Sequence, residues 1–258
     1  MQLSATNLRV LVTAGAAGIG RAIAQTFQSA GARVHICDVD QSALADFRRE
    51  FPRIGASLTD VSDPLAVDRL FDEVERAIGG LDVLVNNAGI SGPTAAVEAI
   101  AIDDWERTIA VNLNGMFYCT RRAVPLLKDA GGGSIINLSS VAGRLGFPQR
   151  TPYAASKWAV IGFTESLAIE LGPHNIRVNA IQPGVVAGAR IERVIEAKSK
   201  ALAISHEEMR DRMLAHVSLR RTVSADDIAN MALYLASDAG QNITGQALSV
   251  CAGVETLT

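Results

Sequence analysis

The sequence has few cysteines, and their positions exclude several kinds of site. Only Cys37, Cys119 and Cys251 occur among the 258 residues, and no two of them form a Cys-x-x-Cys pair. Scattered cysteines of this kind are typical of buried, reduced thiols rather than of a disulfide framework. We therefore expect a cytoplasmic protein. The histidines are also sparse and show no His-Glu-x-x-His or similar ligand spacing, so we expect no metal site.

Long apolar runs and an excess of positive charge are lacking too. No apolar run is long enough to cross a bilayer, and Met1–Asn7 shows neither the basic nor the apolar region of a signal peptide. The formal net charge is -3, whereas nucleic-acid-binding domains are usually basic. We therefore expect a small-molecule partner, with no membrane or nucleic-acid partner.

What the chain does have is a regular alternation of short apolar segments and longer segments of helical periodicity. The expected strands cover Leu8–Thr13, Arg33–Cys37, Ala56–Leu58, Leu81–Val85, Ser134–Leu138, Ile176–Ile181 and Ala247–Val250. The expected helices cover Ile19–Ala30, Gln41–Glu50, Pro64–Ile78, Ile102–Lys128, Thr151–Leu171, 189–216 and Ala225–Ala236. This alternation predicts one α/β domain over residues 1–258, with a doubly wound (Rossmann), mainly parallel seven-stranded sheet and helices on both faces. Thr151 is expected to cap its helix, and Pro125 lies where a proline can kink one.

A glycine-containing turn follows the first expected strand and opens the first expected helix. Small residues there let the backbone approach a pyrophosphate, and the helix N-terminus supplies N–H groups and a favourable dipole. A glycine cluster alone is weak evidence, but this one has the strand and the helix that a dinucleotide site requires. The residues expected to contact the cofactor are Gly15, Ala17, Gly18, Ile19 and Gly20.

Asp38 ends the second expected strand, and its place favours NAD over NADP. A carboxylate there can accept hydrogen bonds from both hydroxyls of the adenosine ribose, and it repels a 2′-phosphate. Neither Ala16 nor Ala17 offers a basic side chain for that phosphate. Taken alone, Asp38 would be read as a solvated carboxylate at a strand end; behind this turn it predicts an NAD site.

Tyr153 and Lys157 are spaced to share one face of an expected helix. A lysine ammonium beside a phenol favours the phenolate and lowers its pKa, so the pair can move a proton with tyrosine as the acid/base. The same spacing occurs by chance on many helices. Ser140 strengthens the case because it ends a strand at the carboxyl edge of the sheet, where its hydroxyl can bond a substrate oxygen. Ser139 is a rival, since adjacent strand residues point to opposite faces.

These motifs together resemble the short-chain dehydrogenase/reductase family over nearly the whole chain. The features that match in order are Gly18-Ile19-Gly20, Asn86-Asn87-Ala88-Gly89, Asn112, Ser140, Tyr153, Lys157 and Pro183-Gly184. The resemblance implies an oxidoreductase that transfers a hydride between NAD(H) and a secondary alcohol or ketone, such as a sugar or a hydroxy acid. It also implies a homotetramer assembled through the long helices Ile102–Lys128 and Tyr153–Leu171.

The resemblance further implies a role for each matching residue. Tyr153 would be the catalytic acid/base, Ser140 would polarise the substrate oxygen, and Asn112 would hold a water in a proton relay. Lys157 would also bind the nicotinamide ribose. The other implied cofactor contacts are Asp60 and Val61 at the adenine, Asn87, Ala88 and Gly89 at the sheet edge, and Pro183, Gly184, Val185 and Val186 near the carboxamide.

The chain departs from the family pattern at three places. Ala14 stands where the family has its first turn glycine, and it fits only if its φ is negative. Gly188 replaces a threonine that often bonds the carboxamide, and Cys251-Ala252 replaces a common Asp-Gly pair. These departures leave the carboxamide contacts and the C-terminal interface open.

We expect the substrate contacts in two segments, a lid at about 185–221 and the loop before Tyr153. The lid is rich in both basic and acidic residues, most of which are expected to form a solvated helical face. Arg144 and Arg150 lie nearer the chemistry, and either could bind a substrate anion or form a structural ion pair.

Two other functions compete with the oxidoreductase. One is a dinucleotide-binding or sensing protein without catalytic activity on the same fold, because fold does not fix function. The other is a sugar-nucleotide epimerase or dehydratase, which shares the tyrosine–lysine spacing. Members of that class add a C-terminal substrate domain for which 258 residues leave little room.

Overall fold

The sheet is the centre of the computed structural model, which describes residues 3–257. Its seven strands are all parallel and lie in the order β3-β2-β1-β4-β5-β6-β7. They are β1 (Arg9–Thr13), β2 (Arg33–Asp38), β3 (Gly55–Leu58), β4 (Val83–Asn86), β5 (Gly133–Leu138), β6 (Ile176–Pro183) and β7 (Ala247–Val250). The strand order reverses direction between β1 and β4, which is where open α/β sheets bind ligands. The predicted doubly wound fold is confirmed.

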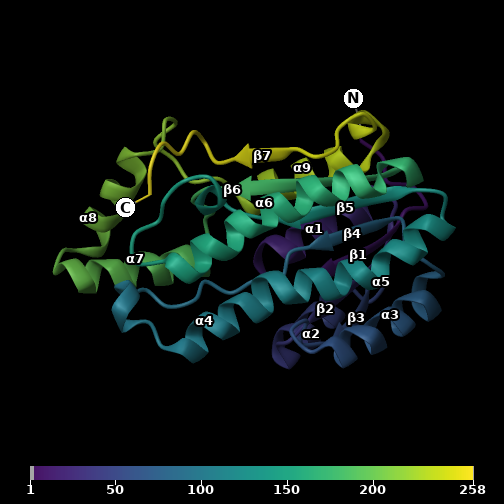
Figure 1. The fold of residues 1–258 in the computed structure, drawn as a ribbon, viewed down its shortest axis with the longest axis horizontal. Helices are drawn as coiled ribbons and strands as arrows, with labels where there is room; N and C mark the ends of the chain where they lie inside the picture. The colour runs from purple at the N-terminus through teal and green to yellow at the C-terminus, as the bar shows by residue number, and fades with distance from the viewer. Residues whose placement is uncertain (1–2, 258) are drawn as a thin grey trace.

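Helices cover both faces of the sheet. They are α1 (Gly18–Ser29), α2 (Gln41–Glu50), α3 (Pro64–Ile78), α4 (Ile102–Ile109), α5 (Gly115–Asp129), α6 (Thr151–Leu171), α7 (Ala189–Leu202), α8 (His206–Ala215) and α9 (Ala225–Ala236). Short turns of helix complete the chain at Val97–Ala99, Ala110–Asn114, Val141–Gly143, Gly172–His174 and Asp238–Gly240. One core packs α1, α2 and α9 against the sheet, and a second packs α3, α5 and α6 against the other face. The strands point toward the end of the molecule that carries α7 and α8 (Figure 1).

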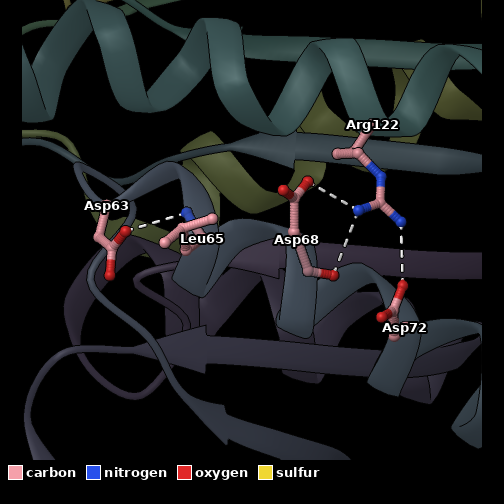
Figure 2. Close-up of polar contacts among 5 residues, drawn as sticks. All are labelled: Asp63, Leu65, Asp68, Asp72 and Arg122. Carbon is pink, nitrogen blue, oxygen red and sulfur yellow. Dashed lines mark hydrogen bonds and ion pairs between the residues drawn. The ribbon is translucent and has the colours of Figure 1, made fainter.

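Hydrogen bonds join α3 to α5 in the helical layer that these two helices form with α6 (Figure 2). The Asp63 carboxylate accepts the Leu65 N–H at 2.9 Å and caps α3, while Pro64 fits the first helical turn. From α5, the Arg122 guanidinium donates to Asp68 at 2.7 Å and to Asp72 at 3.0 Å. These contacts hold the helix that follows the Ala110–Asn114 turn.

The structure corrects three expectations about helices. The expected Ile102–Lys128 helix is interrupted by a π-helical turn at Ala110–Asn114, where the backbone takes in an extra residue. The expected 189–216 helix is two helices, because Ala203 adopts a left-handed φ of 52° that ends α7. Thr151 is the first residue of α6 rather than its cap; Arg150 precedes the helix and gives no side-chain cap. Within residues 3–257, no helix is long and apolar enough to cross a membrane.

Candidate active site

The glycine turn lies at the carboxyl ends of β1 and β4, where the strand order reverses. Gly20 has to be glycine because a Cβ there would lie 2.1 Å from the Ala14 carbonyl oxygen. Gly18 has a left-handed φ of 54°, and a Cβ built on it would meet no atom within 4 Å. The first turn of α1 therefore presents its backbone to open space, as a phosphate cradle must.

Ala14 contradicts the expectation of a negative φ. Its φ is 49°, in the left-handed region that costs an L-residue about 1–2 kcal/mol relative to the right-handed one. The Asn87 amide donates to the carbonyls of Thr13 at 2.9 Å and of Ala14 at 3.0 Å, which holds the strained turn in place. Ala252, in the C-terminal departure from the family pattern, is also left-handed, with φ 54°.

Asp38 lies at the end of β2, beside the turn. One carboxylate oxygen accepts the Ala16 N–H at 3.1 Å, and the other accepts the Asp40 N–H at 3.1 Å. The carboxylate therefore faces the glycine turn from the neighbouring strand.

Asp60 and Val61 follow β3 along the same sheet edge. Partial burial raises the pKa of Asp60, but hydrogen bonds from Ser62 and the Arg107 guanidinium, 3.1 Å away, outweigh burial and hold that pKa below its ordinary value. Val61 is buried and lies under Gly115, the first residue of α5. Both residues thus lie against the segment that runs from α4 to the start of α5.

Thr13 is a residue that the sequence reasoning missed. Its buried hydroxyl oxygen accepts the N–H groups of Asn87 at 3.0 Å and Ala88 at 2.9 Å. The hydroxyl therefore joins the end of β1 to the Asn87-Ala88-Gly89 segment after β4. Its place at the last residue of a strand, just before the glycine turn, was the available signal.

The two serines after β5 have different partners. Ser139 donates its hydroxyl to the Lys157 carbonyl at 2.8 Å, which fastens the strand end to α6. The Ser140 oxygen accepts the Ala142 N–H at 3.1 Å, so its O–H hydrogen remains available to a substrate oxygen. Of the two alternatives, the geometry favours Ser140 as the substrate contact.

Tyr153 and Lys157 lie on one face of α6, as their spacing predicts. The Lys157 ammonium is 5.8 Å from the centre of the Tyr153 ring, and it donates to the Leu138 carbonyl at 2.7 Å. Lys157 is buried, whereas the Tyr153 ring is partly exposed. A cation close to a phenol at the carboxyl edge of the sheet is an arrangement that can transfer a proton.

Asn112 lies in the π-helical turn, and both polar atoms of its side chain are hydrogen-bonded. The amide accepts the Ile90 N–H at 2.7 Å and donates to the Ile90 carbonyl and the Ser156 hydroxyl, both at 3.0 Å. Ser156 in turn donates to the Tyr153 carbonyl at 2.7 Å. Asn112 is thus joined to the tyrosine's helix through Ser156, a residue that the sequence reasoning did not single out.

The segment after β6 leads into the part of the chain that was expected to form a lid. Gly184 donates to the Val250 carbonyl at 3.0 Å, and the Val185 carbonyl accepts the Val223 N–H at 2.9 Å. Val186 forms a bridge with the same Val223, so both ends of the segment that carries α7 and α8 meet there. Gly188 has φ 138°, a conformation that threonine rarely adopts, so a family-type threonine would be strained here.

The two arginines of the loop between Ser140 and α6 have contacts in different parts of the molecule. Arg144 donates to the Val254 carbonyl at 3.1 Å and so fastens the C-terminal segment. Arg150 is buried, with its guanidinium 5.4 Å from the centre of the Tyr153 ring, and it donates to the Ser91 carbonyl at 2.6 Å. Arg150 is therefore the nearer of the two to the acid/base candidate. The described residues contain no group of three or more side chains that could hold a metal ion.

Comparisons with known proteins identify the family of the chain. The family model described as enoyl-(acyl carrier protein) reductase matches residues 14–255. A trans-4-hydroxycyclohexanecarboxylate dehydrogenase from Sinomonas cyclohexanicum is 38% identical, over 94% of this chain and 91% of that protein. A 3alpha-hydroxysteroid dehydrogenase from Mediterraneibacter gnavus is 36% identical, over 95% of each chain.

Solved structures of similar proteins hold nicotinamide cofactors. A 7 alpha-hydroxysteroid dehydrogenase complexed with NADH and 7-oxo glycochenodeoxycholic acid has a TM-score of 0.89 and 32% identity, over 100% of this chain and 97% of that one. An actinorhodin polyketide ketoreductase with NADPH has a TM-score of 0.92 and 33% identity, over 98% and 99%. With the sheet order, the glycine turn and the serine, tyrosine and lysine in place, the chain belongs to the short-chain dehydrogenase/reductase family.

Proposed function

We propose that this protein is an NAD(H)-dependent oxidoreductase that interconverts a secondary alcohol and a ketone. The observation that carries the proposal is that Tyr153, Lys157 and Ser140 lie at the same sheet edge as the open glycine turn. Relatives named as dehydrogenases and reductases, and structures that hold NADH or NADPH, support an oxidoreductase with a nicotinamide dinucleotide.

The residues present fit such a cofactor. The pyrophosphate would lie on the backbone of Gly15, Ala17, Gly18, Ile19 and Gly20, where the absent Cβ at Gly18 leaves open space. Asp38 would bind the adenosine ribose, and Asp60 and Val61 would border the adenine. The nicotinamide half would meet Asn87, Ala88, Gly89, Lys157 and the segment from Pro183 through Gly184 and Val185 to Val186. When bound, the nicotinamide supplies the two-electron chemistry by accepting or donating a hydride.

The chain's own groups would handle the proton and the orientation. In the oxidation direction, the Tyr153 phenolate oxygen takes the proton of the substrate hydroxyl as the C–H hydride leaves; in reduction, it returns the proton. The Lys157 ammonium stabilises negative charge on the phenolic oxygen. Ser140 donates its O–H hydrogen to the substrate oxygen, and Asn112, through Ser156, holds the backbone of Tyr153 in place.

The choice of NAD over NADP rests on Asp38. Its carboxylate already bonds the turn at Ala16, so a 2′-phosphate would be placed against a fixed negative charge with no basic side chain in the turn to offset it. The similar structures hold cofactors of both kinds, so the preference is an inference from this chain.

We also propose a homotetramer in the cytoplasm. Large apolar side chains are exposed on α4, α5 and α6; they are Ile102, Trp105, Phe117, Trp158 and Ile169. Such faces mark contacts between protein chains. Light scattering would test the assembly, because a monomer at working concentration would refute it. The cysteines present as free thiols suit a reducing compartment.

The test of the proposed function is a screen of secondary alcohols, sugars and hydroxy acids with NAD, read at the nicotinamide absorbance. Wild type should reduce NAD with at least one member, and Tyr153→Phe should not, although both should bind NAD. Binding without turnover across the screen would favour the dinucleotide-binding alternative. Absence of binding to NAD and NADP alike would refute both functions.

A further inference from the structure

Three side chains from two separate segments meet beside the acid/base candidate. Phe147 and Arg150 belong to the loop between Ser140 and α6, and Lys198 belongs to the lid helix α7. The centre of the Phe147 ring is 5.3 Å from the Arg150 guanidinium carbon and 4.8 Å from the Lys198 ammonium. We call these three residues the cationic pocket.

The two cations are buried rather than spread over the surface. Arg150 is 3% exposed and Lys198 is 6% exposed. Burial and the neighbouring Arg150 charge both lower the pKa of Lys198 from its ordinary value. Within residues 3–257, no carboxylate lies at ion-pair distance from the Lys198 ammonium, in contrast to Lys200, which pairs with Glu196 on the same helix.

Contact with an aromatic ring does not by itself balance the burial of Lys198, whereas Arg150 also donates to the Ser91 carbonyl. A cation over a phenylalanine contributes about 0.5–2 kcal/mol, whereas removing an ammonium from water costs several kcal/mol. A ligand anion between the two cations would reverse the balance at Lys198, since the ammonium would gain a charge-assisted hydrogen bond in a region already shielded from water.

The position of the pocket decides what that anion would be. Arg150 contacts the rings of both Phe147 and Tyr153, so it bridges the pocket and the proton-transferring phenol. Lys198 reaches the same place from the lid. An anion held there would be attached to the molecule that reacts at Tyr153, and it would join the lid to the body of the protein.

We propose that the cationic pocket binds the carboxylate of the substrate, so that the enzyme oxidises a hydroxy acid or reduces a keto acid. This inference rests on the proposed function and names the substrate class of the proposed oxidoreductase. Arg150 and Lys198 fix the carboxylate end, Ser140 and Tyr153 hold the reacting oxygen, and the two anchors orient the carbon between them. Lys198 also makes closure of the lid depend on the charge of the substrate.

The experiment compares short 2-hydroxy, 3-hydroxy and 4-hydroxy acids with their methyl esters, using NAD and the full-length protein. In wild type, kcat/KM for at least one acid should exceed that for its ester by about 10- to 100-fold, the effect of a hydrogen bond to a charged group. Lys198→Met should remove most of that preference by raising KM for the acid, with the ester little changed. Lys200→Met, an exposed lysine on the same helix, is the matched control and should retain the preference.

A second measurement does not depend on turnover. Sodium butyrate should raise the Tm of the wild-type protein with NAD bound more than butyramide does, and Lys198→Met should abolish the difference. Arg150→Met is the companion variant; because Arg150 also bonds Ser91, circular dichroism must first show that this variant is folded.

The outcomes separate this inference from the proposed function. Neutral alcohols or esters used as well as acids, with equal effects of butyrate and butyramide, would overturn the carboxylate pocket and leave the oxidoreductase standing. An acid preference that survives in both Lys198→Met and a folded Arg150→Met would also overturn it. If neither this panel nor the broader screen of alcohols and sugars is oxidised, the proposed function fails, and a butyrate effect that is lost in Lys198→Met would still support an anion site.

Discussion

The buried histidine of β2 should make the stability of this protein depend on pH in a predictable window. His35 is 5% exposed, and its Nε2 lies 2.8 Å from the Ser57 hydroxyl, which itself donates to Glu73. Because the Ser57 proton goes to Glu73, Nε2 is the donor to Ser57. Burial lowers the pKa of His35 from 6.5 to about 4, although the nearby Glu73 charge opposes this.

The direction and size of the effect follow from this pKa. In the unfolded chain, His35 takes up a proton near pH 6.5, whereas in the folded protein His35 stays neutral until about pH 4. The free energy of unfolding should therefore fall as the pH drops through this window, by up to about 3 kcal/mol. Asp60, whose pKa is held below 3.8, loses its contribution largely below the window.

Urea unfolding at fixed protein concentration, at several pH values between 7 and 4, would measure the loss. His35→Gln keeps a donor for Ser57 but does not titrate, so its stability should fall less steeply with acidification than that of wild type. His174→Gln, at an exposed histidine, is the control and should follow wild type. Equal slopes for wild type and His35→Gln would refute the reasoning.

Four further outcomes are expected. Tyr153→Phe should lower kcat by about 10²–10⁴-fold with cofactor binding intact; a kcat above about a tenth of wild type would place the acid/base elsewhere. Wild type should bind NAD more tightly than NADP in titrations of the apo protein, and Asp38→Ala should narrow the difference; equal or tighter binding of NADP by wild type would contradict the assignment. Ala14→Gly should raise the free energy of unfolding by about 0.5–1 kcal/mol in urea, since relief of the left-handed alanine outweighs the added entropy of the unfolded chain; a loss of stability would disprove the strain. Ser140→Ala should lower kcat with little change in Tm, whereas Ser139→Ala should lower Tm; the reverse pattern would exchange the roles of the two serines.

Local signals were sufficient where one segment carried all of the information. The bounds of α3 were predicted correctly because Asp63 supplies a cap, Pro64 suits the first turn and Gly79 ends the helix with a left-handed φ of 79°. The strands were found for a similar reason, since doubly covered parallel strands are continuous apolar runs. In the site, the positions of Tyr153 and Lys157 on one helical face followed from their spacing alone.

The features that the sequence could not reveal depend on contacts between distant segments. The hydrogen bonds to Ile90 and Ser156 that accompany the π-helical turn around Asn112 are tertiary. The left-handed φ of Ala14 is supported by Asn87, far along the chain. Lys198 was only one of several charged residues in the segment expected to form a lid, and its contact with Phe147 is what distinguishes it.

The bonds of the Asp38 carboxylate have a consequence for how cofactor preference can evolve. The same group that would select the cofactor also ties the glycine turn to β2 through Ala16 and meets Asp40, whose own carboxylate caps α2. Asp38 would thus both select the cofactor and hold the glycine turn in place. A lineage that drifts toward the phosphorylated cofactor by losing this carboxylate also loosens the loop that either cofactor needs. Other substitutions nearby would therefore have to replace the hydrogen bond between Asp38 and the glycine turn before a preference for the phosphorylated cofactor could be useful.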